Sequence, residues 1–326
     1  MDYSVLIPFL PRRTEQVLPY AALVEWTGAR RLWQGQSLLM EPFQTFSAVA
    51  GAGFRVPTGL GVTLMPLRHP FEAAHQIKSL AMATGQSVLA GFGPGAKSFQ
   101  QSLLGAPYGS QLTAVREYLT IVRELLGGGV VEAKGDYYSC HARMGPVMSP
   151  EVQVGLGVLR PGMARLAGEI ADAAITWLTP AAYLDAVVRP ALREGAAAAG
   201  RPEPKVTAMV PVALERAGRD VSDFVLSSNS GHMMAPHYID MLGRAGIDFS
   251  KMDPQSAGRL MADAGAFLHG DLESVTKQLD EYRLAGVDEI VLNLTGVANL
   301  YGPKAAMEDL KRILTAVGAD RREARA

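Results

Sequence analysis

The chain has 326 residues, 48% of them apolar, and 31 Lys and Arg against 32 Asp and Glu. That length and composition allow a large core, and the balanced charge argues against a nucleic-acid partner. A single cysteine, Cys140, excludes an internal disulfide and a cysteine-rich metal site. There is no signal-peptide pattern, and no uncharged stretch reaches the roughly 20 residues that span a bilayer. We therefore expect a cytoplasmic protein that uses no metal and binds no membrane.

Short apolar runs alternate with helical patterns through the first half of the chain. Continuous apolar runs bounded by turn residues are typical of buried parallel strands. Thr14 is a candidate N-cap, and Pro70 stands where a helix tolerates proline. The expected strands are 4–9, 31–33, 59–64 and 87–92, and the expected helices are 14–26, 41–50, 70–83 and 111–126.

The same alternation continues to the C-terminus. The expected strands are 152–158, 173–177, 206–214 and 289–294, and the expected helices are 162–170, 180–200, 272–285 and 304–317. Eight βα units predict an α/β fold and favour a closed (β/α)8 TIM barrel over an open sheet, although periodicity alone does not settle closure. We expect one domain over residues 1–318 and a charged tail over 319–326.

Two segments interrupt the alternation. Residues 127–148 hold glycine-rich bends and two tyrosines, which predicts a hairpin or loop after the fourth helix. Residues 220–264 form a long insertion near the seventh strand, rich in methionine and containing His232 and His237. Long insertions at the carboxyl ends of barrel strands commonly shape or cover an active site.

Five short motifs occur in one order along the chain. They are Gly59–Pro70 with its Arg-His-Pro ending, Gly91–Gly95, Gly135–Tyr138, Leu166–Asp172 and Ala285–Val291. Together they resemble the luciferase-like monooxygenase superfamily of flavin- and deazaflavin-dependent oxidoreductases. The resemblance covers nearly the whole chain and is weakest in the long insertion.

The resemblance implies a cofactor site at the strand ends. Gly61, Val62 and Thr63 match the place where the family carries a non-proline cis peptide beneath the cofactor ring, and Gly93, Pro94 and Gly95 match a loop that faces the ring or its phosphate chain. Glycine lets backbone approach a ligand closely, although the same glycines could serve only as turns. The phosphate is expected at the start of a helix, at Val158, Leu159, Arg160, Pro161, Gly162 and Met163. Arg160 is a departure, because the family commonly has glycine there.

The residues that usually handle protons in this family are absent. Ser37 stands in place of a pocket histidine, Gln36 in place of the acid or amide before it, and Ala96 in place of a frequent carboxylate. Serine has no accessible pKa, so the proton would come from water or another group. The candidates for catalytic roles are Ser37, Gln36 and His232, with His237, Tyr108 and Glu41 as further proton sources. Arg68 and His69 are expected to be structural.

Three functions stay open on these residues. Leu166–Asp172 and Trp177–Pro180 resemble the branch that uses coenzyme F-420, a 5-deazaflavin, which implies hydride transfer to C=C or C=N of a small organic substrate. The alternatives are an FMN-dependent monooxygenase and a non-catalytic flavin- or ligand-binding barrel. Met233, Met234 and Met241 suggest an adaptable apolar wall. Relatives in the family tend to be homodimers, which implies the same here.

Overall fold

The barrel is closed by eight parallel strands. The computed structural model describes residues 1–320. The strands pair in the order β11, β1, β2, β3, β4, β7, β8, with β9 bonded to both β8 and β11 to complete the circle. This arrangement confirms the predicted (β/α)8 barrel. The barrel strands are β1 (Asp2–Leu6), β2 (Leu32–Gln34), β3 (Thr58–Leu64), β4 (Val88–Gly93), β7 (Val152–Gly157), β8 (Ala173–Trp177), β9 (Lys205–Leu214) and β11 (Glu289–Asn293).

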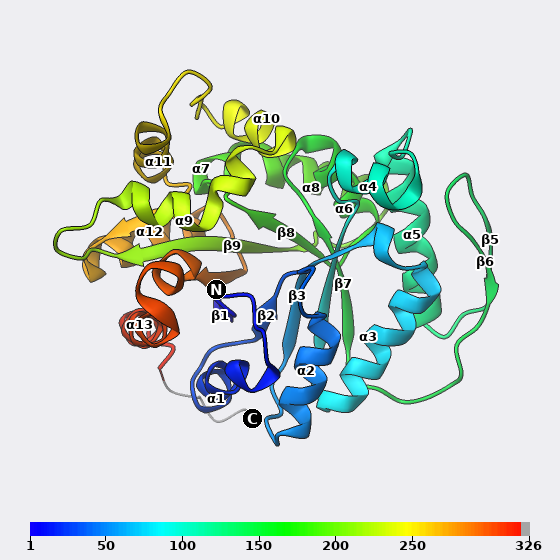
Figure 1. Ribbon diagram of the computed structural model, residues 1–326. Coiled ribbons are helices and arrows are strands. Elements are labelled where there is room, and N and C mark those ends of the chain that lie inside the picture. The colour runs from blue at the N-terminus through cyan, green and yellow to red at the C-terminus, as the bar shows by residue number, and fades with distance from the viewer. Residues whose placement is uncertain (321–326) are drawn as a thin grey trace.

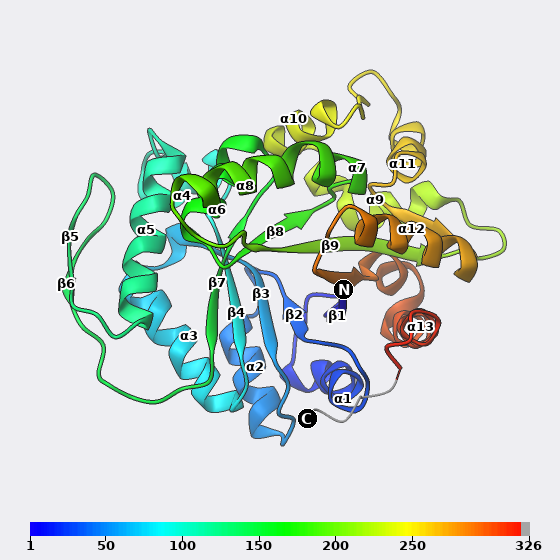
Figure 2. The same ribbon diagram turned by 180° about the vertical axis from the view of Figure 1, so that it is seen from behind.

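Helices surround the strands on the outside (Figures 1 and 2). The helices of the outer layer are η1 (Thr14–Val17), α1 (Leu18–Trp26), α2 (Pro42–Gly51), α3 (Pro70–Thr84), α5 (Gln111–Leu126), α6 (Pro161–Ile170), α8 (Arg189–Ala198), α12 (Leu272–Leu284) and α13 (Thr295–Ala316). Shorter helical pieces are η2 (Met65–Leu67), α4 (Lys97–Leu104), α7 (Ala181–Tyr183) and the π-helical η3 (Leu184–Val188). Among residues 1–320, no helix is both long and apolar enough to cross a bilayer.

The two interrupting segments both have regular structure. The hairpin after α5 is antiparallel, with β5 (Val131–Lys134) paired to β6 (Ser139–Ala142), and it extends as an arm beside α5 in Figures 1 and 2. The long insertion follows β9, the seventh barrel strand, and contains α9 (Val221–Met233), α10 (Pro236–Arg244) and α11 (Pro254–Asp263). The short strand β10 (Leu268–Gly270) then pairs with the end of β9.

Some element boundaries differ from those expected. The first strand begins at Asp2 and ends at Leu6 rather than covering 4–9. The expected helix 180–200 is divided into α7, η3 and α8. Helix α4 was not predicted, because the polar sequence Lys97–Leu104 has only a narrow apolar stripe and buries only Gln100. The expected last helix starts earlier, at Thr295, and is kinked where Gly302 has φ 86°.

The barrel interior is filled by layers of side chains from alternate strand positions. The middle layer consists of Leu6, Trp33, Leu89, Ala173, Ile175, Met209 and Val291, with Val62 and Trp177 packed against it. Trp33 is fully buried, and an added Cβ on Gly59 would lie 2.1 Å from its ring. The glycine therefore provides the room that this large side chain needs inside the barrel.

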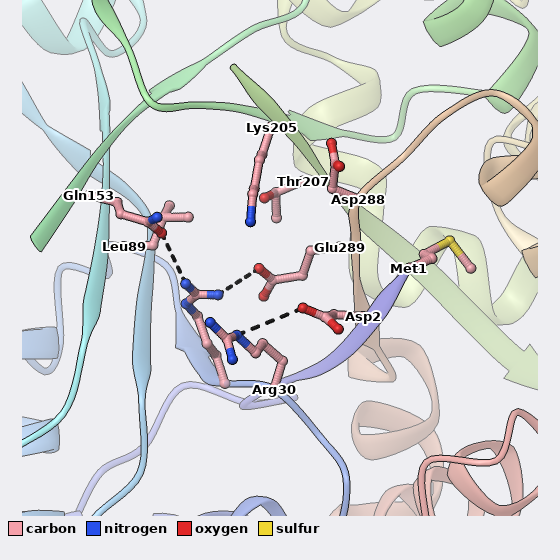
Figure 3. Close-up of a pocket in the computed structure, with 10 residues that line it drawn as sticks. Met1, Asp2, Arg30, Leu89, Gln153, Lys205, Thr207, Asp288 and Glu289 are labelled. Carbon is pink, nitrogen blue, oxygen red and sulfur yellow. Dashed lines mark hydrogen bonds and ion pairs between the residues drawn. The ribbon is translucent and has the colours of Figure 1, made fainter. Parts of the chain in front are cut away.

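A polar layer closes the amino-terminal end of the barrel. Glu289 and Arg31 form a buried ion pair of 2.9 Å there, and Arg31 also donates to Gln153 at 3.1 Å. These groups line a cavity of about 220 Å³ together with Arg30, Lys205 and other side chains. Figure 3 shows Glu289, Gln153, Arg30 and Lys205 around it. Charge pairing at the amino-terminal end of a barrel serves stability rather than catalysis, and this cavity lies at the end opposite the loops that carry the predicted site.

Candidate functional site at the carboxyl end of the barrel

The predicted site residues gather at one end of the barrel. Gln36 and Ser37 follow β2; Gly61, Val62 and Thr63 lie in the last part of β3; and Gly93 ends β4, with Pro94 and Gly95 after it. Val158 and Leu159 follow β7, and Arg160, Pro161, Gly162 and Met163 lead into α6. Because β2, β3, β4 and β7 are consecutive neighbours in the barrel, parallel pairing places all these loops side by side.

The floor of this site is backbone rather than side chain. The Gly61–Val62 peptide is cis, as the resemblance implied. An added Cβ would lie 2.9 Å from Val62 Cγ2 if placed on Gly93, and 3.4 Å from Val62 Cγ1 if placed on Gly157. Val62 itself is only partly buried. Gly93 and Gly157 therefore leave room for the Val62 side chain itself, and the backbone around it suits a flat ligand that needs close backbone approach.

Gly61 lies against side chains inside the barrel rather than against Val62. An added Cβ there would lie 2.1 Å from Met209 Cε and 3.2 Å from Trp33 Cε3. A larger side chain at Gly61 would therefore disturb the packed middle layer of the barrel. Thr63, by contrast, is buried and donates its hydroxyl to the Gly91 carbonyl at 3.1 Å, so it ties β3 to β4.

Gln100 holds the loop after β4 in place. This fully buried side chain donates to the carbonyl oxygens of Pro94 at 3.0 Å and Gly95 at 2.9 Å, and accepts from the Tyr108 amide at 3.0 Å. Gly95 has φ 72°, a left-handed conformation that favours glycine. The loop at the edge of the floor is consequently fixed from the α4 side.

The amino terminus of α6 offers free amide groups. Arg160 is the N-cap residue and makes no capping bond with its side chain, and Pro161 is the first helical residue. The first-turn amides of a helix have no carbonyl partner within it and carry partial positive charge. The Arg160 guanidinium is half-exposed and lies 3.5 Å from Asp240 of α10, so the insertion touches this helix terminus.

Ser37 is used within its own loop. Its hydroxyl donates to the Met40 carbonyl at 3.0 Å and accepts from the amides of Leu39 at 3.3 Å and Met40 at 3.1 Å. These contacts describe a turn that holds the chain between β2 and α2. The hydroxyl proton is therefore committed to a backbone carbonyl.

Gln36 belongs to a polar cluster beside the floor. Its backbone amide donates to the Val62 carbonyl at 3.3 Å, and its side-chain Nε2 donates to Glu41 Oε1 at 3.0 Å. Glu41 is also paired with Arg68, whose guanidinium lies over the Phe43 ring at 5.2 Å from the ring centre. We call Gln36, Glu41 and Arg68 the mouth cluster.

His232 lies against Trp177 at the end of β8. Their rings are stacked with centroids 5.3 Å apart, and Tyr238 of α10 meets His232 edge-on at 4.9 Å. Burial, with a smaller contribution from nearby His237, lowers the pKa of His232 to about 4. The imidazole is thus neutral near pH 7 and poorly suited to donate a proton from its charged form.

The other suggested proton sources are also constrained. Tyr108 and Tyr138 bond to each other through their hydroxyls, and burial raises the pKa of Tyr108 above its ordinary value. Burial lowers the pKa of His237. Neither group has a pKa shifted toward ready proton donation at neutral pH.

Sequence reasoning missed two features of the site. Trp177 has a buried Nε1 without a hydrogen-bond partner, and the next residue, Leu178, is held at φ 55°, a conformation that costs energy for a non-glycine residue. The pairing of Arg68 with Glu41 was missed as well, since Arg68 was expected to be only structural. His69 does behave so: its Nδ1 accepts from the Phe71 amide at 3.2 Å and caps α3.

Comparisons with known proteins agree with this geometry. The family described as luciferase-like monooxygenase matches residues 1–289. A curated relative, the 5,10-methylenetetrahydromethanopterin reductase of Methanopyrus kandleri, is 26% identical over 277 residues, which cover 73% of this chain and 76% of that protein.

Two solved structures share the fold over nearly their whole length. An F-420-dependent secondary alcohol dehydrogenase in complex with an F-420–acetone adduct has a TM-score of 0.74 at 17% identity, covering 96% of this chain and 98% of that chain. The oxygenating constituent of 3,6-diketocamphane monooxygenase from Pseudomonas putida, in complex with FMN, has a TM-score of 0.70 at 17% identity, covering 96% of each chain. With the family match over residues 1–289, the barrel and its strand-end site identify this chain as an oxidoreductase that belongs to the luciferase-like monooxygenase family.

Proposed function

We propose that this protein binds coenzyme F-420 and transfers hydride from its reduced form to a C=C or C=N bond of a small organic substrate. The observation that carries the proposal is the backbone floor at Gly61–Val62, bordered by Gly93 and Gly157. The similarity to a reductase of methylenetetrahydromethanopterin supports a reduction rather than an oxygen insertion.

The residues present fit a deazaflavin. A Cβ on Gly93 or Gly157 would press against the Val62 side chain. Because these side chains are absent, Val62 and the surrounding backbone form the surface that we assign to the flat ring. When bound, the cofactor supplies the hydride; the protein supplies position and surroundings. The amides of Gly162 and Met163 at the α6 terminus are the groups we assign to the cofactor phosphate, because a helix N-terminus favours anions.

Arg160 has a second role in this proposal. Its guanidinium lies within reach of both the α6 terminus and Asp240, so it can pair with a phosphate while staying oriented by the insertion. The family's common glycine at this position would give no such cation.

Solvent is the proton source that the site leaves available. Ser37 is bonded to backbone, and His232 is neutral. Trp177 Nε1 and His232 can still orient a polar group of the substrate by hydrogen bonding. We assign them to substrate binding rather than to proton transfer.

Two other functions each have one observation in favour. The FMN complex of a structure with the same fold favours an FMN-dependent monooxygenase. The commitment of Ser37 to its own loop, where the family has histidine, favours a barrel that binds a flavin without turnover.

An anaerobic single-turnover experiment separates these functions. Reduced F-420 is mixed with the protein and a panel of conjugated C=C and C=N acceptors, and the absorbance of oxidised cofactor is followed. We expect oxidation with at least one acceptor. Binding of the cofactor without oxidation by any acceptor would support the non-catalytic function, and product oxygenation with reduced FMN and air would support the monooxygenase.

A further inference from the structure

In the mouth cluster, a single carboxylate oxygen takes part in both the ion pair and a second hydrogen bond. One carboxylate oxygen, Glu41 Oε1, receives both the Arg68 guanidinium and Gln36 Nε2. An arginine and a carboxylate commonly meet through two parallel bonds, which uses both oxygens and two nitrogens. Here the second carboxylate oxygen of Glu41 and the second terminal nitrogen of Arg68 take no part in the pair.

Three buried polar atoms of the cluster have no partner. They are Glu41 Oε2, Arg68 Nη1 and Gln36 Oε1. The Arg68 side chain is only 9% exposed, so its unpaired nitrogen is well removed from solvent. A buried donor or acceptor that stays unpaired costs free energy, and three in one cluster indicate that something else completes them.

The cluster is fixed in position and open to the barrel mouth. Stacking on Phe43 and a bond from the Tyr118 hydroxyl to the Arg68 carbonyl, 3.2 Å, hold Arg68. Glu41 keeps 33% of its side chain exposed. The Gln36 amide bonds directly to the Val62 carbonyl, so the cluster stands immediately beside the floor.

The unpaired atoms define the chemistry of an occupant. Arg68 Nη1 requires an acceptor, whereas Glu41 Oε2 and Gln36 Oε1 require donors. The opposite charges of Glu41 and Arg68 cancel, so the occupant need not be charged. A neutral group with a C=O next to an N–H meets the requirements of Arg68 Nη1 and Glu41 Oε2.

We propose that the mouth cluster recognises the edge of a cyclic amide, with Arg68 donating to its carbonyl and Glu41 accepting from its N–H. This proposal rests on the proposed function, and it assigns the substrate to the class of unsaturated lactams or related cyclic amides. The deazaflavin ring carries the same edge in its pyrimidinedione end, so the shared chemistry has two possible sources, substrate and cofactor.

For a lactam substrate, the cluster also has a place in the reaction. When bound, the reduced cofactor would supply hydride to the carbon of C=C remote from the carbonyl, and the electron pair of the double bond would move toward the carbonyl oxygen. Water would protonate the carbon next to the carbonyl and would take up the proton that the cofactor loses on oxidation, so that C=C becomes CH–CH. Arg68 Nη1 stabilises the negative charge that develops on the carbonyl oxygen.

Equilibrium binding tests the proposal without turnover. Isothermal titration calorimetry of the protein with oxidised F-420 bound would use an unsaturated six-membered lactam, its N-methyl derivative and the corresponding lactone. We expect the lactam to bind about tenfold or more tightly than the other two, because only the lactam has an N–H for Glu41. Glu41→Gln should remove most of that preference, and Gln36→Ala is a second variant should Glu41→Gln fail to fold.

The matched control is Glu72→Gln, the same change at an exposed position of α3. It should behave as wild type. Direct titration of each variant with F-420 shows whether the mouth cluster binds substrate or cofactor. If Glu41→Gln loses only the lactam preference, the cluster binds substrate. If Glu41→Gln lowers F-420 affinity about tenfold or more, the cluster binds the cofactor ring. Equal binding of lactam and lactone together with unchanged F-420 affinity in Glu41→Gln overturns the proposal. Absence of F-420 binding to wild type instead contradicts the proposed function, and the lactam comparison is then made on the protein alone.

Discussion

Replacing Glu289 by glutamine should strongly destabilise the barrel. Glu289 is 5% exposed, and its carboxylate accepts three hydrogen bonds. Oε1 accepts from the Ser4 hydroxyl at 2.6 Å and from Trp33 Nε1 at 2.8 Å, while Oε2 accepts from Arg31 Nη1 at 2.9 Å. Figure 3 shows Glu289 among the polar side chains that line the cavity at this end of the barrel.

The magnitude follows from what glutamine cannot do. Its amide has one acceptor oxygen, so either Arg31 or the pair Ser4 and Trp33 must face an NH₂ group. Arg31 is 4% exposed and would keep its charge without a counter-ion. Removing one partner of a buried ion pair typically costs about 3–5 kcal/mol, and we expect a loss in this range.

Guanidinium unfolding followed by circular dichroism measures the effect. The matched control is Glu194→Gln, which breaks a surface ion pair with Arg165 and should change stability little, because solvent screens exposed ion pairs. Adding Arg31→Met to Glu289→Gln removes the unpaired cation and should restore part of the lost stability. The reasoning is refuted if Glu289→Gln and Glu194→Gln shift the unfolding midpoint equally.

Two further predictions concern the carboxyl end of the barrel. Gly157→Val should lower F-420 affinity by about tenfold or more, because its branched side chain would lie against Val62; fluorescence titration measures the affinity. The control is Gly145→Val, at a loop position with open space. Equal F-420 affinities of the two variants would place the ring elsewhere. The pKa of His232 is lowered to about 4 from an ordinary value of about 6.5. As pH falls, the unfolded state therefore binds a proton before the folded state does. The free energy of unfolding should be constant above about pH 6.5 and decrease toward pH 4 by up to about 3 kcal/mol. His232→Phe keeps a ring against Trp177 and should flatten that decrease in urea unfolding across pH, and an unchanged pH profile would show that His232 is not the responsible group.

Most of the fold could be predicted because the barrel strands are buried on both sides. The run Ala173–Trp177 is apolar except for Thr176 and was predicted with the bounds that the structure has. The start of the first strand was placed too late because the polar Asp2 gives no apolar signal. Ser4, also polar, is buried against Glu289 in the polar layer. A hydropathy pattern does not reveal a partner that is 285 residues away.

The glycines of the candidate site could be named from the sequence, whereas its side-chain pairings could not. Gly61, Gly93 and Gly95 mark strand ends where backbone must come close to other groups, and their spacing is visible in the sequence. The pairing of Glu41 with Arg68, and the stacking of His232 on Trp177, depend on how separate loops meet. The insertion was recognised by its length, but its three helices and their contact with the α6 terminus through Arg160 required the folded arrangement.

A parallel titration of the purified protein with F-420 and FMN, followed by fluorescence, tests the central claim most directly. The proposed site has no feature that distinguishes the two rings, so the comparison itself decides the cofactor. We predict saturable binding of F-420 with an affinity at least tenfold above that for FMN, and a matching loss in Gly157→Val. Tight binding of FMN without binding of F-420 would contradict the account.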